Sequence, residues 1–175
     1  MTSSPRLLTV LAVTAAAAAA FVASTSHAAR DVTRCRGAQL AGTFAAVPGS
    51  AGAGNITYAL KLKNTSAVAC TVTGLPLGRL LGRFKVPLPT QVRAAFPGAL
   101  TAILVTLKPG QSTRATARFS PDVPGTGEQM SGRCEPIAYW FKVSGQGGGS
   151  TLVKVVPPTP VCEHGRLSFS AYGTA

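Results

Sequence analysis

The sequence predicts an all-β domain: a two-sheet antiparallel sandwich of immunoglobulin-like type, with eight or nine short strands and two disulfides. Apolar and polar residues alternate in several stretches of four to eight residues, the period of a half-buried strand. Glycine- and proline-rich turn signals separate these stretches, and no convincing helical pattern lies between them. Four cysteines, an even number, follow a segment typical of exported proteins, which favours a disulfide-bonded domain.

That segment, residues 1–28, is predicted to be a secretory signal peptide. One basic residue, Arg6, precedes an apolar run from Leu7 to Ala23, and Ser26-His27-Ala28 fits the small-x-small rule for cleavage after Ala28. An uncleaved membrane anchor is the alternative, but the run is short for a span of about 20 residues. Residues 29–175 have the length of a single β-sandwich domain, so we expect a secreted product without a stable membrane span.

Alternation is clearest over Asn55–Pro76, which we expect to form an amphipathic hairpin. Ile56–Lys63 places four large apolar side chains on one face and polar or small ones on the other. Asn64–Ser66 has the residue types of a turn, and Val68–Val72 resumes the alternation.

The remaining strands are predicted from the same period and from turn residues. A second hairpin is expected around the glycine-rich tip Gly145–Ser150. Trp140 precedes this tip and could lie either in the core or on the surface, because alternation places it opposite Tyr139 and Phe141. The expected segments are Gln39–Val47, Leu77–Leu81, an edge strand at Gln91–Ala94, a buried strand at Leu100–Leu107, Thr113–Phe119, Ile137–Val143, Leu152–Val156 and Arg166–Tyr172.

Four cysteines allow three pairings, and the predicted hairpins favour Cys35–Cys70 with Cys134–Cys162. A hairpin that folds near residues 49–54 brings residue 35 close to the upper sixties. One that folds near residues 147–149 brings residue 134 opposite residue 161. A structural metal site is a weaker interpretation, because the sequence has no Cys-x-x-Cys pair and one histidine after the signal. No metal or other cofactor is therefore expected.

Several short motifs resemble a family of secreted actinobacterial domains, domain of unknown function 4232. They are Asn55-Ile56-Thr57-Tyr58, Lys61-Leu62-Lys63-Asn64-Thr65-Ser66, Cys70, Gly74-Leu75-Pro76, Leu107-Lys108-Pro109-Gly110-Gln111-Ser112, Cys134-Glu135-Pro136 and Cys162. The resemblance spans roughly Cys35 to Tyr172. It implies no catalytic residues, because the family has none established. Many members are lipoproteins, but a charge at Arg34 before Cys35 departs from the lipidation pattern and favours a soluble product.

The stretch from Leu77 to Lys85 mixes apolar residues with three cations, Arg79, Arg83 and Lys85, and fits neither strand nor helix period throughout. A solvated strand edge protected by its charges is one interpretation. The other is a contact patch for an anionic polymer or a protein partner. The chain after the signal carries 16 basic against 5 acidic residues, a net charge of +11, which favours anionic partners.

No catalytic set is evident. His164 next to Cys162 could suggest a Cys-His pair, but an oxidised cysteine is not a nucleophile. Glu135 and Glu163 could approach each other if Cys134 and Cys162 are bonded, and a salt-bridged rim with neighbouring arginines is then expected. Motifs for phosphate or dinucleotide binding are missing from the sequence.

These features favour a secreted or cell-envelope, non-enzymatic binding module for an anionic envelope polymer or a protein partner. An inhibitor or accessory subunit of a secreted enzyme is the alternative. A nucleic-acid partner would suit the positive charge of the chain but not an exported protein. In addition, aromatic residues do not alternate with the basic ones as stacking platforms for bases would.

Overall fold

The computed structural model describes residues 32–99 and 103–174, so the predicted signal peptide lies outside the described residues. Strands make up most of the regular structure. They are β1 (Leu40–Ala46), β2 (Ile56–Asn64), β3 (Cys70–Val72), β4 (Gly78–Leu81), β5 (Gln91–Ala94), β6 (Val105–Leu107), β7 (Ser112–Phe119), β8 (Ala138–Ser144), β9 (Ser150–Thr159), β10 (Arg166–Phe169) and β11 (Gly173–Thr174). The helical turns are short: η1 (Gly37–Gln39), η2 (Pro97–Ala99) and α1 (Cys162–Gly165). No helix in the described part of the chain is long and apolar enough to cross a membrane.

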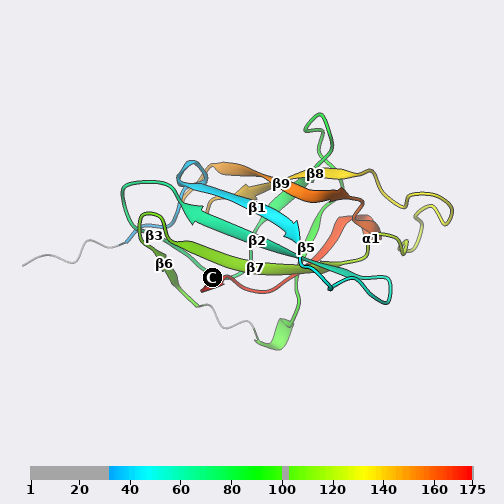
Figure 1. The fold of residues 1–175 in the computed structure, drawn as a ribbon, viewed down its shortest axis with the longest axis horizontal. Helices are drawn as coiled ribbons and strands as arrows, with labels where there is room; N and C mark the ends of the chain where they lie inside the picture. The colour runs from blue at the N-terminus through cyan, green and yellow to red at the C-terminus, as the bar shows by residue number, and fades with distance from the viewer. Residues whose placement is uncertain (1–31, 100–102, 175) are drawn as a thin grey trace, which may run out of the picture. The chain divides into compact units, whose positions relative to one another are not determined.

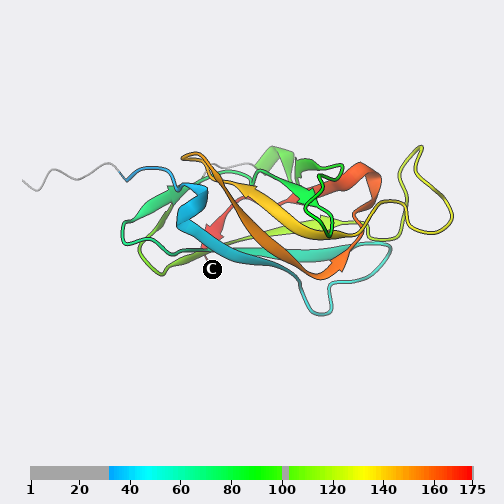
Figure 2. The ribbon, with the colours of Figure 1, turned by 90° about the horizontal axis from the view of Figure 1, so that it is seen from above.

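The all-β class is confirmed, but the two-sheet immunoglobulin-like sandwich is wrong. Nearly all strands join one sheet in the order β4-β8-β9-β1-β2-β7-β10-β5, to which β11 adds by pairing with β7. Two of the pairings, β1 with β9 and β10 with β5, are parallel, so the sheet is mixed rather than antiparallel. The sheet curls over itself, and its strands do not share a plane (Figures 1 and 2). The result is a nearly closed, barrel-like sheet.

The chain that follows β4 brings the two ends of this sheet together. Residues 86–88 turn back along β4, where the Leu88 N–H donates to the Leu80 carbonyl at 2.9 Å. The Leu80 N–H in turn donates to Thr90 Oγ1 at 2.9 Å, directly before β5 begins. The edge of β4 is therefore covered by the chain itself, and its charges do not guard an open edge.

An aromatic cluster fills the space inside the curled sheet. Phe44 on β1 lies at its centre, with ring centroids 5.3 Å from Tyr58, 5.4 Å from Phe141 and 5.9 Å from Phe169. All four side chains are buried, and the Tyr58 hydroxyl donates to the Pro157 carbonyl at 2.8 Å. Alternation along β1, β2 and β10 places Phe44, Tyr58 and Phe169 in this core, as the sequence predicts, and β8 contributes Phe141.

Two predicted elements are wrong. Asn55–Pro76 is not one hairpin: β2 pairs with β1 and β7, whereas β3 pairs with β6 in a separate two-stranded sheet. Of the predicted buried strand Leu100–Leu107, residues 100–102 lie outside the described part of the chain; within residues 103–107 only β6 is a strand, and Ile103 and Leu104 are more than half exposed.

The hairpin of β8 and β9 forms as predicted, with one irregularity that alternation could not reveal. The register shifts between Ala138 and Trp140, so that Ala138 and Phe141 are both buried. Trp140 is consequently half-buried on the outer side of the sheet, the second of the two positions considered for it.

The disulfides join Cys35 to Cys70 and Cys134 to Cys162, the pairing that the hairpin argument favours. The register of β1 with β2 sets Leu40 opposite Asn64. Beyond that pair, the segment before β1 lies along β3: the Cys35 N–H donates to the Thr71 carbonyl at 2.9 Å, which sets Cys35 beside Cys70.

Candidate functional site

The outward side chains of the curled sheet form a basic outer face. Each strand contributes its exposed alternate positions, while the other positions point into the core. Two pairs of like charges lie directly opposite each other across neighbouring strands: Arg79 with Lys142, and Lys61 with Arg114. Like charges in such positions destabilise a sheet. The exposed cations of this face are Lys61, Lys63, Arg79, Arg93, Arg114, Arg118, Lys142 and Lys154.

Acidic residues are segregated from this face. Within the described residues, all four acids lie in the loop of residues 120–137 or in α1: Asp122, Glu128, Glu135 and Glu163. Among the described lysines and arginines, Arg166 alone has a carboxylate within 4.0 Å, that of Glu163 at 3.6 Å. The cations of the basic outer face therefore have no counter-ion within 4.0 Å among the described residues.

A groove of about 620 Å³ lies on this face, beside β4 and β8. Arg79, Lys85 and Lys142 line it, and acidic residues are not among the described residues of its wall. Its other lining residues are apolar or carry hydroxyls: Leu40, Leu81, Pro87, Leu152, Ser150 and Thr151, next to Gly37 and Ala38 of η1. We call it the β4–β8 groove.

Trp140 lies next to the β4–β8 groove, between two lysines. Its cross-strand partners are Leu81 on β4 and Lys154 on β9. The ammonium groups of Lys85 and Lys154 each lie 5.9 Å from the centroid of its ring, within the range of a cation–π interaction.

The structure thus brings two of the three predicted patch residues, Arg79 and Lys85, to one groove. The third, Arg83, does not line it; its guanidinium lies 6.0 Å from the ring of the exposed Phe84. Sequence reasoning missed Lys142 and Lys154, because alternation gives the face of a residue but not the strand beside it.

A second cluster surrounds the Cys134–Cys162 disulfide. The Glu128 carboxylate, whose side chain is 2 % exposed, accepts the backbone N–H of Gly125 at 2.6 Å, that of Glu163 at 2.9 Å and that of His164. His164 Nδ1 lies 3.6 Å from Glu128 and 3.8 Å from Glu135. Glu163 and His164 both have positive φ, so Glu128 stabilises a strained left-handed turn.

The two carboxyls of this cluster have opposite pKa shifts. Burial favours a raised pKa for Glu128, but hydrogen bonds from the backbone N–H groups of His164, Gly125 and Glu163 outweigh it, and the pKa is lowered. Burial raises the pKa of Glu135, and the hydrogen bond and negative charge of Glu128 beside it act in the same direction. Glu135 is thus the member of the pair that takes up a proton first.

Glu128, Glu135 and His164 each offer one potential ligand atom within 4.8 Å of one another, a set that could hold a metal ion. Glu128 already accepts three backbone N–H groups, however, so its lone pairs serve the fold. Glu163 pairs with Arg166 at 3.6 Å, as a salt-bridged rim would require, whereas Glu135 faces Glu128 and not an arginine. Sequence reasoning missed the central role of Glu128, which lies 35 residues from Glu163 in a glycine-rich loop.

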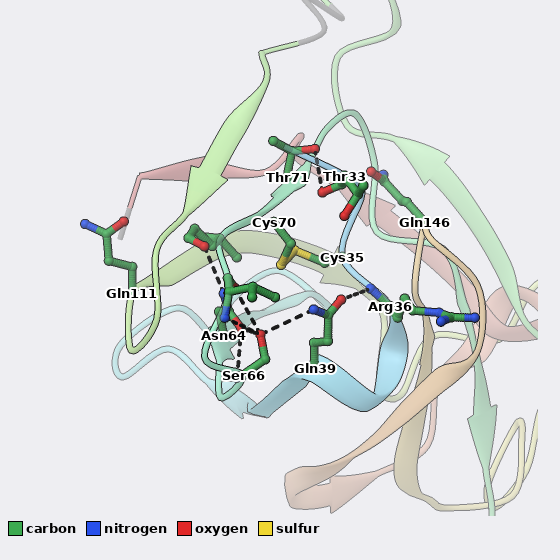
Figure 3. The surroundings of a disulfide bond; sticks show 12 residues. Thr33, Cys35, Arg36, Gln39, Asn64, Ser66, Cys70, Thr71, Gln111 and Gln146 are labelled. Atoms are coloured by element: carbon green, nitrogen blue, oxygen red, sulfur yellow. Dashed lines mark hydrogen bonds between the residues drawn. A yellow bond between two sulfur atoms is a disulfide. The ribbon is translucent and has the colours of Figure 1, made fainter. Parts of the chain in front are cut away.

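Two of the motifs that carry the family resemblance, Lys61–Ser66 and Leu107–Ser112, meet beside Cys70 at the Cys35–Cys70 disulfide (Figure 3), whereas Cys134-Glu135-Pro136 and Cys162 lie at the other disulfide. Asn64 is fully buried, and its Nδ2 donates to the carbonyls of Val68 at 2.8 Å and Leu107 at 2.9 Å. Its Oδ1 accepts the backbone N–H of Ser66 at 2.9 Å, and its backbone N–H donates to the Gln111 carbonyl at 2.9 Å. These residues therefore join β2, β3, β6 and β7 at one end of the sheet, which is a structural role.

Comparison with known proteins agrees with this resemblance. No curated protein and no solved structure matches the chain. One family model does, over residues 35–172, which is most of the chain and includes all four cysteines. The chain therefore belongs to the family described as Domain of unknown function (DUF4232).

Proposed function

We propose that this protein is a non-enzymatic binding module of the cell envelope or the secreted fraction, and that its partner is an anionic polymer. The observation that carries the proposal is the segregation of charge. Within residues 32–99 and 103–174 the exposed cations of the basic outer face have no counter-ion, and two like-charged pairs lie opposite each other at a cost in stability. An anionic polymer would supply the missing counter-charge.

Two disulfides are typical of proteins from an oxidising compartment and support an extracellular setting. The arrangement of acids favours binding over catalysis. Glu128 is occupied by backbone N–H groups, and His164 lies in a strained turn that this carboxylate holds. A general base needs a free lone pair near its substrate, and Glu128 has little to offer.

The test is retention of the mature, oxidised protein on isolated bacterial cell walls across a salt series. Binding through exposed cations weakens as salt screens the charges, so retention should fade between low and physiological ionic strength. No retention at any ionic strength would contradict the proposal.

Retention that survives high salt would point to a specific receptor instead. A stoichiometric, salt-resistant complex with one secreted protein would favour the inhibitor or accessory subunit. A variant with neutral Glu135 and His164, Glu135→Gln/His164→Gln, should bind walls like the wild type, because these residues lie outside the basic outer face.

A further inference from the structure

The β4–β8 groove differs from the rest of the basic outer face, because it combines cations with apolar and hydroxyl-bearing walls. Resting on the proposed function, we propose that this groove binds one anionic sugar unit of a glycan, with its charge at Arg79 and Lys142 and its ring towards Trp140. The charge could be a carboxylate or a phosphate, since both present oxygen atoms that guanidinium and ammonium groups bind.

The anion would lie between Arg79 and Lys142. These residues occupy opposite positions on β4 and β8, so their side chains leave the sheet side by side on the same face. Lys85 lines the same groove from the loop that follows β4. An arginine fork binds two oxygen atoms at once, and a bound anion removes the repulsion between Arg79 and Lys142.

The remainder of the groove fits a sugar ring better than a bare polyanion. Pro87 and Leu152, which are both exposed, offer apolar surface, while Ser150 and Thr151 offer hydroxyls. A sugar ring has both an apolar C–H face and hydroxyl groups, so it can use both kinds of wall. A phosphate chain can use neither apolar surface nor an aromatic face.

Trp140 extends this surface beyond the groove. Leu81, which lines the groove, is its cross-strand partner, and Lys85 reaches from the groove towards its ring. Lys154 approaches the same ring at 5.9 Å. A sugar that contacts the indole would therefore have an ammonium group within reach of its acidic substituent.

Trp140 is the only tryptophan of the chain, so its fluorescence reports on this site alone. The mature protein is titrated with trigalacturonate, with a phosphorylated trisaccharide of equal charge, and with linear inorganic polyphosphate. We expect saturable binding of a charged trisaccharide with a change in Trp140 emission, and weaker binding of polyphosphate without that change. The sugar probe that binds more tightly shows whether the groove prefers a carboxylate or a phosphate.

A matched pair of variants separates the groove from charge in general. Arg79→Gln/Lys142→Gln removes the like-charged pair in the groove, and Lys61→Gln/Arg114→Gln removes the other pair, on β2 and β7. The first should weaken trisaccharide binding by about tenfold or more, and the second by less than about twofold. Neither should lower the melting temperature, because each relieves a repulsion. The Trp140→Leu variant lacks the fluorescent side chain, so its binding is measured by calorimetry. It should bind the sugar probe more weakly than the wild type does, and polyphosphate equally well.

Equal losses in the two double variants, or equal binding of polyphosphate and sugar, would overturn the groove assignment. If cell walls still retain the protein in that case, the proposed function stands without the groove assignment. If neither walls nor probes bind, the proposed function fails as well.

Discussion

Glu128 accepts a hydrogen bond at 2.9 Å from the backbone N–H of Glu163, which lies 35 residues further along the chain. The same carboxylate accepts the N–H groups of Gly125 and His164. Through these bonds one side chain connects the long loop before β8 to the turn before β10. Glu128 is therefore a structural carboxylate, although it lies beside residues that could suggest chemistry.

Glu128→Gln is expected to lower the free energy of unfolding by about 1–3 kcal/mol. The amide keeps the shape but loses the charge, and its NH₂ group cannot accept the N–H groups that face the carboxylate. Denaturant unfolding measures the effect. Glu163→Gln is the control: its carboxylate is 43 % exposed and pairs with Arg166, so the change should be below about 1 kcal/mol. Equal effects of the two substitutions would contradict the structural role of Glu128.

Acid should destabilise the protein through this same carboxylate. The folded-state pKa of Glu128 is lowered, so the stability that it contributes is complete above its unfolded pKa of about 4.3 and is lost as the pH falls through the folded value. Melting temperatures from neutral pH down to about pH 3 should fall in the wild type. The fall should be smaller in Glu128→Gln.

The pKa shift of Glu135 has the opposite sign to that of Glu128, so the effect of pH on stability is reversed. Its raised folded-state pKa means that its ionised form is unfavourable in the folded protein, so stability is present below its unfolded pKa and decreases as the pH rises through the folded value. Glu135→Gln should therefore melt at a higher temperature than the wild type at neutral pH, and the difference should vanish in acid. A lower melting temperature at neutral pH would show that the Glu135 charge is needed for the fold.

The amino-acid pattern predicts faces and short-range order well in this chain. Alternation places Tyr58, Leu60 and Phe119 in the core, and hairpin register predicts the Cys35–Cys70 bond. What it does not contain is the identity of the neighbouring strand. β3 has the pattern of a partner for β2, yet it pairs with β6, and nothing local in Thr90 indicates that its hydroxyl accepts the N–H of Leu80.

The candidate groove shows the same limit. Arg79 and Lys85 could be chosen from sequence because their stretch fits no regular period. Lys142 could not, because its relevance depends on β4 lying beside β8, a pairing between segments about 60 residues apart. Long-range pairing is a property of the whole chain, and a single sequence encodes it only weakly.

Asn64→Ala should lower the free energy of unfolding by at least about 2 kcal/mol, because it leaves the carbonyls of Val68 and Leu107 without their side-chain donor in a buried position. Ser66→Ala, which removes a partly exposed hydroxyl next to Asn64, serves as the control and should cost about 0.5–1.5 kcal/mol. Denaturant titrations compare the two. An Asn64→Ala variant as stable as Ser66→Ala would show that these carbonyls find water instead.

The two disulfides should contribute different amounts to the free energy of unfolding, although the chain-entropy model predicts nearly the same amount for each. They close segments of 35 and 28 residues, so the entropic model assigns each about 4 kcal/mol. Cys35 and Cys70 are both fully buried within the hydrophobic core cluster, whereas Cys134 is only partly buried. Cys35→Ala/Cys70→Ala should therefore lose core packing in addition, and its free energy of unfolding should fall further than that of Cys134→Ala/Cys162→Ala. Chemical unfolding of both double variants decides this order, and a larger loss for the second would mean that the Glu128 cluster depends on its disulfide more than the core depends on Cys35–Cys70.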